Sequence, residues 1–326
     1  MQLQENVPVG PKTTMRIGGQ ARYFAELMTR EDVEEAVRFA KEKRIPLIVL
    51  GGGSNTIFAD GIIEAFVVRL KHDAVTIDEN KVTVGAGKIL ASLLNDLAAK
   101  DLDLSPLTGI PGTVGGAVFG NAGQGASRPS PIVASPIGTE SMHTHATNAA
   151  TAGAGGIWIS SFIDTVTVYI DGEWKTLTKD ECHFRYRESW FKDLSLQTTN
   201  YQLQTPPVIW QVTLTVPSKP ATDVQAEIER LIKRRIETQP HIKTAGSCFK
   251  SLPDGTPAWK LIDAAGLRGL KIGGIEVSEK HANFLLNVDK GTFQDALSIT
   301  KTIKEKVPQI TGVEMRFYAE NGRIAA

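Results

Sequence analysis

The sequence lacks the features that would direct it to a nucleic acid or a membrane. Its 36 basic residues are balanced by 36 acidic residues, so no net charge attracts an anionic polymer or lipid. The densest basic run, Lys233-Arg234-Arg235, is short and is expected to form the solvated face of a helix. No apolar stretch approaches the ~20 residues of a membrane span, and the start of the chain has no signal-peptide pattern. We expect a cytoplasmic protein that binds neither nucleic acid nor membrane, and we take it to act as a monomer.

Cysteine is scarce, and the few metal-ligating residues do not form a metal pattern. Cys182 and Cys248 are not in CxxC or any other metal spacing, so free thiols in a reducing compartment are expected rather than a disulfide scaffold. His143 and His145 are two residues apart but lack a third ligand, and solvent-exposed histidines are the expected interpretation. We therefore expect no metal.

What the sequence does contain is a mixture of helical and strand patterns, over a length that allows two or three domains. Hydrophobic periodicity predicts helices at 29–44 (with Thr29 as N-cap), 89–100, 222–240, 257–266 and 293–307. A capping box is expected at Thr222 and Gln225, with Ile232 on the apolar face of that helix. Strands are predicted at 24–27, 46–50, 65–70, 162–170, 208–216, 270–278, 282–288 and 312–318, with a hairpin at 75–87. These elements predict an α+β protein.

One long segment has neither pattern. Residues 126–156 consist almost entirely of Ala, Ser, Thr, Gly and Pro, with no helical or strand period. Such a segment cannot bury enough apolar surface to offset its ordering entropy. We interpret it as a mobile insertion.

A glycine cluster follows the strand at 46–50, and its surroundings restrict the kind of phosphate site that it can form. The motif LGGGSN (50–55) has no following lysine, which excludes a P-loop. Five residues separate Asn55 from Gly61 before the chain enters another strand, so no helix can begin at the loop as a dinucleotide fingerprint requires. Two interpretations remain, an anion nest of backbone N–H groups supplemented by the Ser54 and Asn55 side chains, or a plain tight turn.

A second glycine-rich stretch favours the nest. Residues 109–123, GIPGTVGGAVFGNAG, carry six glycines and a proline, which is too many for an ordinary helix or strand. A segment rich in N–H donors and poor in side chains suits a long, flat ligand. Together with the first loop, it indicates a bound dinucleotide without a Rossmann fold.

Seven motifs in order resemble the UDP-N-acetylenolpyruvoylglucosamine reductase family. They are TTMRIGGQA (13–21), LGGGSN (50–55), GIPGTVGGA (109–117), FRYRESWFK (184–192), AGSCFK (245–250), VSEKHANFLLN (277–287) and GVEMRF (312–317). The resemblance implies an FAD-binding fold like that of the vanillyl-alcohol-oxidase and p-cresol-methylhydroxylase flavoproteins, with two subdomains at 1–74 and 75–217. It further implies an α+β substrate domain at 222–326, whose last strand returns to the active site.

The resemblance also implies a reaction. In this family NADPH reduces a noncovalent FAD, and the reduced flavin passes a hydride to C3 of the enolpyruvyl group of a UDP-sugar. Protonation at C2 then gives UDP-N-acetylmuramate, a precursor of peptidoglycan. Because negative charge builds on the substrate carboxylate, the site needs a cation there and an acid near C2.

Carried onto this sequence, the resemblance assigns residues to three roles. Arg187 would hold the carboxylate, Ser247 would protonate C2, and Glu314 would assist it. Tyr186, Lys250 and Asn283 would bind the substrate. The FAD would be held by Ile17, Gly18, Gly51, Gly52, Gly53, Ser54, Asn55, Gly109, Ile110, Pro111, Gly112, Thr113, Gly115, Gly116 and Asn121.

Other interpretations stay open from the residues themselves. Cys248 competes with Ser247 as the proton donor, but neighbours in an extended segment point opposite ways, so only one of them can face the flavin. Ser251 stands where the family usually has Asn, which would weaken a polar contact to the substrate. Another flavoprotein of the same fold, or a noncatalytic nucleotide-sugar binder, would also fit the glycine loops.

Overall fold

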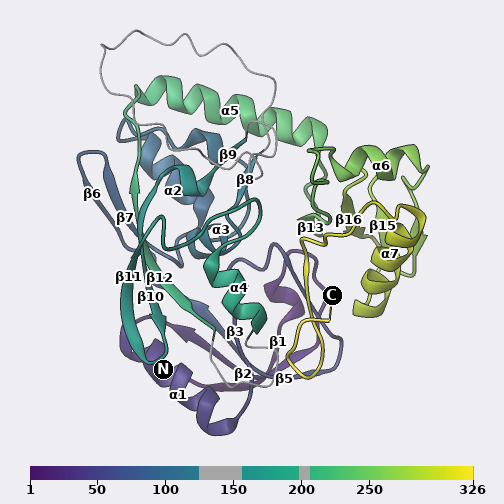
Figure 1. Ribbon diagram of the computed structural model, residues 1–326, viewed down its shortest axis with the longest axis horizontal. Coiled ribbons are helices and arrows are strands. Elements are labelled where there is room, and N and C mark those ends of the chain that lie inside the picture. Colours follow the sequence, from purple (N-terminus) through teal and green to yellow (C-terminus); the bar gives the residue numbers. More distant parts are fainter. Residues whose placement is uncertain (125–155, 198–205, 326) are drawn as a thin grey trace.

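A computed structural model describes residues 1–124, 156–197 and 206–325. The predicted insertion at 126–156, with His143 and His145, lies outside the described residues except for Gly156. The first part of the chain forms a four-stranded sheet in the order β1-β2-β5-β3, from Gln4–Pro8, Gln20–Leu27, Ile62–Leu70 and Leu47–Val49. Helix α1 (Arg30–Lys43) buries the face of Val33, Ala36, Val37 and Ala40 against this sheet, as its period predicts (Figure 1).

The second part is built on an antiparallel five-stranded sheet in the order β11-β10-β12-β7-β6. These strands are Glu173–Thr178, Ile163–Ile170, Val208–Thr215, Lys81–Gly85 and Val75–Asp78. Helices α2 (Leu90–Ala98) and α3 (Val114–Phe119) pack on it through a continuous apolar core. The pair β8 (Gly123–Gln124) and β9 (Ile157–Trp158) and helix α4 (Trp190–Gln197) complete this part.

The third part begins with α5 (Ala221–Thr238), which runs along one edge of the molecule and leads to a small separate sheet (Figure 1). This sheet has the order β13-β16-β15-β14, from Thr244–Ser247, Phe284–Asn287, Ile275–Val277 and Lys271–Ile272. Helices α6 (Ala258–Ala264) and α7 (Phe293–Lys306) enclose its core. Three 3₁₀ turns, at Gly10–Lys12, Ser105–Leu107 and Ile159–Ser161, connect other elements.

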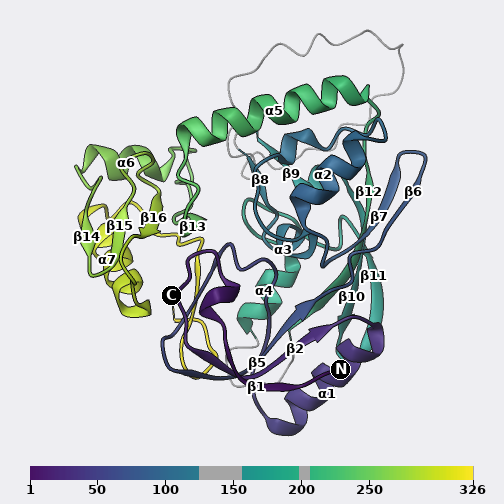
Figure 2. The same ribbon diagram turned by 180° about the vertical axis from the view of Figure 1, so that it is seen from behind.

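The last strand leaves the third part and returns to the first. Strand β17 (Arg316–Tyr318) pairs in parallel with β4 (Thr56–Phe58), the strand that follows the GGGSN loop. Figure 2 shows this return from the opposite side, with the end of the chain near the N-terminal sheet. The residues just before β17 are therefore held beside the glycine loop, although that loop lies far from them in the sequence.

Three local predictions were wrong. Helix α5 begins at Ala221 with Pro220 as its N-cap and no side-chain cap, so Thr222 and Gln225 form no capping box. Ile232 is 43% exposed because the buried stripe of α5 is confined to Val224 and Ile228. The 109–123 stretch does contain a helix, because the Thr113 hydroxyl caps the Gly116 N–H and offsets the low propensity of glycine over one and a half turns.

In the described part of the chain, no helix has the length and apolar character to cross a membrane. Within the same residues, no three His, Cys, Asp or Glu side chains are grouped to hold a metal ion.

Candidate active site

A cavity of about 790 Å³ lies where the three parts of the chain meet. Its walls come from the loop after β3, the start of α3, one face of α4, the end of α5, the end of β13 and the approach to β17. The cavity brings together most of the predicted cofactor residues, namely Gly51, Gly52, Gly53, Ser54, Asn55, Ile110, Pro111, Gly112, Thr113, Gly115 and Gly116.

The two glycine loops pack directly on one another. A Cβ at Gly52 would lie 2.6 Å from the Cα of Gly112, and one at Gly53, whose φ is +69°, would lie 2.3 Å from the carbonyl oxygen of Lys12. Only glycine permits this approach, which brings the backbones of the two loops, and that of Lys12, into direct contact. Both glycine loops also line the cavity, so their backbone can approach an extended phosphate-bearing ligand.

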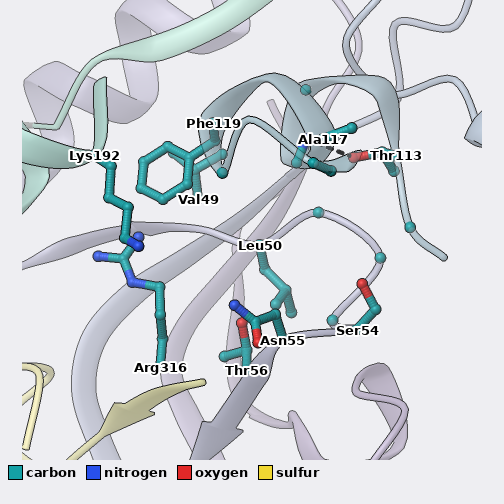
Figure 3. Close-up of a pocket in the computed structure, with 18 of the residues that line it drawn as sticks. Val49, Leu50, Ser54, Asn55, Thr56, Thr113, Ala117, Phe119, Lys192 and Arg316 are labelled. Atoms are coloured by element: carbon teal, nitrogen blue, oxygen red, sulfur yellow. Dashed lines mark hydrogen bonds between the residues drawn. The ribbon is translucent and has the colours of Figure 1, made fainter. Parts of the chain in front are cut away.

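The Ser54 and Asn55 side chains hold the cradle together within the protein. The Ser54 hydroxyl donates to the Pro111 carbonyl at 3.3 Å, which joins the two loops. The Asn55 amide Nδ2 donates to the Glu314 carbonyl at 2.8 Å, and the Arg316 N–H donates to the Asn55 carbonyl at 3.0 Å. Both side chains point among the glycine loops in Figure 3. The phosphate cradle is therefore mainly a backbone structure, and Asn55 links it to the strand that carries Glu314.

Arg187, Ser247 and Glu314 all line the cavity, although each comes from a different element. The Arg187 Nε lies 3.1 Å from the Glu314 Oε2, and the Glu314 side chain is only 12% exposed. Burial raises the pKa of the Glu314 carboxyl, while Arg187, Lys192 and Lys250 oppose that rise. The site thus places a buried carboxyl, whose pKa is raised, among basic side chains that favour its ionised form.

Arg187 is held in a strained turn. Arg185 and Glu188 exchange backbone hydrogen bonds of 3.0 and 3.1 Å, and Arg187 has a φ of +57°, an uncommon conformation for a long side chain. The Arg187 Nη1 donates to the Gly123 carbonyl at 3.1 Å, and its guanidinium lies over the Trp158 ring at 5.2 Å. These contacts fix the direction of the guanidinium before any ligand binds.

The competition between Ser247 and Cys248 is resolved by their orientation. Ser247 lines the cavity, whereas Cys248 is fully buried in the core of the third part. Burial raises the pKa of the Cys248 thiol to about 12. Both cysteines are free thiols in the structure, and both are buried. Ser247 is therefore the neighbour that faces the cavity.

Four predicted cofactor residues do not line the described cavity and instead contact other parts of the protein. Ile17 is buried in the core, and Gly18 packs against Phe58. Asn121 donates from Nδ2 to the Arg185 carbonyl at 2.9 Å, which anchors the strained turn. Gly109 packs against the side chain of Arg235.

The three predicted substrate ligands, Tyr186, Lys250 and Asn283, also have partners within the protein and do not line the described cavity. The Tyr186 hydroxyl lies 3.2 Å from the Ser251 Oγ, and Lys250 pairs with Glu188. Both polar atoms of the Asn283 amide bond to the Phe249 backbone, at 3.0 and 2.9 Å. Substrate contact by these three residues stays a prediction.

Besides Arg187, seven cationic residues that were not predicted as site residues line the described cavity, namely Lys41, Arg44, Lys192, Arg234, Arg235, Arg316 and Arg323. Lys192 and Arg316 extend toward one another beside the Phe119 ring (Figure 3), and burial lowers the pKa of Lys192. The Arg316 Nε has no hydrogen-bond acceptor among the described residues, which fits a ligand rich in acceptors. Assigning Arg235 to a solvated face was wrong, because it is half-buried at the cavity end of α5. The motif segments WFK (190–192) and EMR (314–316) contain Lys192 and Arg316 and were the available signal for them.

The fold and the cavity define the class of protein. A family model described as "FAD binding domain" matches residues 21–139, over the elements that form the glycine cradle. The chain is a flavoenzyme in which an FAD-binding part is followed by a smaller α+β domain, and the predicted fold class is confirmed.

The particular family follows from the rest of the chain. A second model, described as "UDP-N-acetylenolpyruvoylglucosamine reductase, C-terminal domain", matches residues 238–317. The chain is 33% identical over 97% of its length to the UDP-N-acetylenolpyruvoylglucosamine reductase of Gluconobacter oxydans, of which 90% is covered. It is 32% identical over 95% of its length to that of Desulforamulus reducens, again with 90% covered. The protein belongs to the UDP-N-acetylenolpyruvoylglucosamine reductase family.

A solved structure agrees with this assignment. The crystal structure of UDP-N-acetylenolpyruvylglucosamine reductase from Thermus caldophilus superposes with a TM-score of 0.72 at 27% identity. The match covers 97% of this chain and 98% of that chain, so it includes both the FAD-binding part and the C-terminal domain.

Proposed function

We propose that this protein reduces the enolpyruvyl group of UDP-N-acetylenolpyruvoylglucosamine to UDP-N-acetylmuramate, with FAD as cofactor and NADPH as reductant, in peptidoglycan precursor synthesis. The observation that carries the proposal is the meeting of Arg187, Ser247 and Glu314 on one cavity that the two glycine loops also line. The names of its relatives support the same substrate.

The residues present fit FAD and divide the chemistry among them. The backbone N–H groups of Gly51–Gly53, and those of Gly112 and Thr113, make no backbone hydrogen bond in the described structure and would hold the pyrophosphate. When bound, the flavin supplies the hydride. Arg187, already fixed by Gly123 and Trp158, would hold the carboxylate on which negative charge develops.

Ser247 and Glu314 would manage the proton. Ser247 faces the cavity and would donate its hydroxyl proton to C2 of the substrate. Glu314 lines the same cavity, and burial raises the pKa of its carboxyl, which favours its role as a partner of the serine during the transfer. The Arg187 Nε lies 3.1 Å from the Glu314 Oε2, so the group that would hold the substrate carboxylate is next to the group that would assist the proton transfer.

Two of the cationic residues that were not predicted from the sequence, Arg234 and Arg235, could bind the diphosphate groups of the ligands. Arg234 and Arg235 line the cavity at the end of α5, and Arg235 packs over Gly109 of the second glycine loop. The UDP-sugar and FAD both carry a diphosphate. We therefore propose that this pair of arginines binds diphosphate oxygens, a role that suits a planar, always-charged donor.

We further propose a single-chain enzyme that acts in a reducing compartment. We expect the protein to act as a monomer and to take its hydride from NADPH. Two free buried cysteines support a reducing compartment such as the cytoplasm.

The proposal is tested with the purified, FAD-loaded protein. NADPH should bleach the flavin absorbance, and only the enolpyruvyl UDP-sugar should restore the colour under anaerobic conditions. Bleaching by NADPH with recolouring by oxygen alone would indicate a flavoprotein oxidase instead. A protein that retains no flavin would contradict the proposal as a whole.

A further inference from the structure

The Glu188 carboxylate lies between two lysines that belong to different parts of the chain. It forms an ion pair with Lys250 of the third part, and both of its oxygens lie 3.4 Å from the Lys192 ammonium of α4. The three side chains are 13–26% exposed, so the pairs are largely shielded from water. Glu188 itself does not line the described cavity, and nothing in the proposed reaction uses it.

On one side, this group supports the turn that presents Arg187. Glu188 closes the turn through its backbone bonds to Arg185, and Lys192 donates from Nζ to the Arg187 carbonyl at 2.9 Å. The Arg187 backbone is in the left-handed region, which persists only where the surroundings hold it. The carboxylate of Glu188 holds Lys192 in the position from which it bonds to Arg187.

On the other side, the group supports the segment that presents Ser247. Lys250 follows Ser247 by three residues, and its N–H donates to the Gly312 carbonyl at 2.9 Å. The Glu314 N–H in turn donates to the Cys248 carbonyl at 2.8 Å. These two hydrogen bonds join residues 247–250 to residues 312–314. A displacement of Lys250 would therefore also displace Ser247 and Glu314.

We propose that Glu188 is a positioning residue that fastens the arginine turn (185–188) to the serine segment (247–251) through Lys250. The inference rests on the proposed function and assigns Lys250 to this contact instead of to the substrate. The adjacent Tyr186–Ser251 hydrogen bond crosses the same boundary and makes a second, neutral contact between the two segments. Together they set the separation of the cation from the proton donor.

Two substitutions separate this role from substrate binding. Glu188→Gln and Lys250→Met each remove one partner, and each should slow recolouring of the reduced flavin about 10-fold or more in kcat, leaving bleaching by NADPH within about 3-fold. The double variant should be no slower than the worse single variant, because both remove the same contact. If Lys250 binds the substrate directly, Lys250→Met will raise KM and Glu188→Gln will not, and the inference is overturned.

The structural readout uses the flavin-free protein, so it does not depend on catalysis. In Glu188→Gln, hydrogen exchange should accelerate in peptides covering both 185–192 and 247–251, while Lys250→Arg should retain slow exchange. Unchanged exchange in 247–251 would refute the coupling. Glu305→Gln, which breaks the exposed Lys301–Glu305 pair of α7, is the matched control and should leave both segments and both half-reactions unaltered.

Failure of the proposed function is recognised separately. If the wild-type protein is not recoloured by the enolpyruvyl sugar, the function is wrong while the exchange result still stands. If the wild type is active and Glu188→Gln loses flavin, both half-reactions and melting temperature together, Glu188 has a general structural role and the positioning inference fails.

Discussion

Ser247 and Cys248 are adjacent in the chain but face opposite environments, which gives a direct test at the scale of the residue. Ser247→Ala should slow the substrate half-reaction by about 10²–10⁴-fold, the range typical of a lost general acid. Flavin reduction by NADPH should continue at nearly the wild-type rate. Cys248→Ala is the control, because its side chain lies in the core. It should lower the melting temperature and leave both half-reactions unchanged; equal loss of both in Ser247→Ala would exclude the proposed role.

The buried carboxyl of Glu314 predicts a pH dependence. Its pKa is raised above 4.5 by burial, so the protonated form persists to higher pH than in an unfolded chain. The substrate half-reaction should therefore slow as pH rises through that raised pKa, and Glu314→Gln should lose this part of the profile. The stability of the wild type relative to Glu314→Gln should be greatest below pH 4.5 and decline as pH rises, because ionisation then occurs in a buried site. Stopped-flow recolouring and urea unfolding over pH 4–9 measure the two effects; parallel profiles for both proteins would contradict the assignment.

The catalytic motifs identified which residues surround the cavity, but not which of their atoms are free to bind. Arg187, Ser247 and Glu314 were predicted from their motifs and all line it. Tyr186, Lys250 and Asn283 come from the same motifs, yet their polar atoms already bond within the protein. Sequence spacing cannot distinguish these cases, since a hydrogen-bond partner 34 or 62 residues away is decided by packing.

At the scale of the element, the contact between the two glycine loops makes a specific prediction. In Gly52→Ala the added Cβ would lie 2.6 Å from backbone at Gly112, where no flexible side chain can move aside. Overpacking of this kind costs about 1–3 kcal/mol, so FAD affinity should fall about 5-fold to 100-fold. Glu305→Gln, in the exposed Lys301–Glu305 pair of α7, is the control and should leave the affinity unchanged. Fluorescence titration of the apoprotein with FAD measures both; equal affinities would show that the loops can separate.

Element boundaries were predicted well where a side chain marks them and poorly where backbone or tertiary contacts do. Thr29 was predicted as an N-cap and forms a full capping box with Asp32. At α5 the same kind of motif misled, because Pro220 takes the N-cap position and Thr222 falls inside the helix. Helix α3 was not predicted because it contains glycines. The Thr113 side chain caps it, and the surrounding core stabilises it.

At the scale of the whole molecule, the cofactor should add to the stability of the fold. The glycine cradle, β17 and the serine segment meet at one cavity, so a bound FAD would contact several parts of the chain at once. A ligand present at 100 times its Kd stabilises the native state by about 2.7 kcal/mol, or roughly 5 °C in a protein of this size. Differential scanning fluorimetry of apoprotein and FAD-loaded protein should show this rise. An unchanged melting temperature would mean that the cradle does not bind the cofactor.

The sequence by itself determined most of the longer elements, the exclusion of P-loop and Rossmann sites, and the family, because these depend on local period, residue type and ordered motifs. Tertiary structure decided how the elements meet. The parallel pairing of β17 with β4 carries Glu314 to the GGGSN loop, 259 residues away from Asn55, to which its carbonyl bonds. The positions of Lys192, Arg235 and Arg316 on the cavity wall also depend on packing between parts of the chain. A local motif can contain such a residue but cannot place it in the cavity, since its position depends on the free energy of burying whole surfaces against one another.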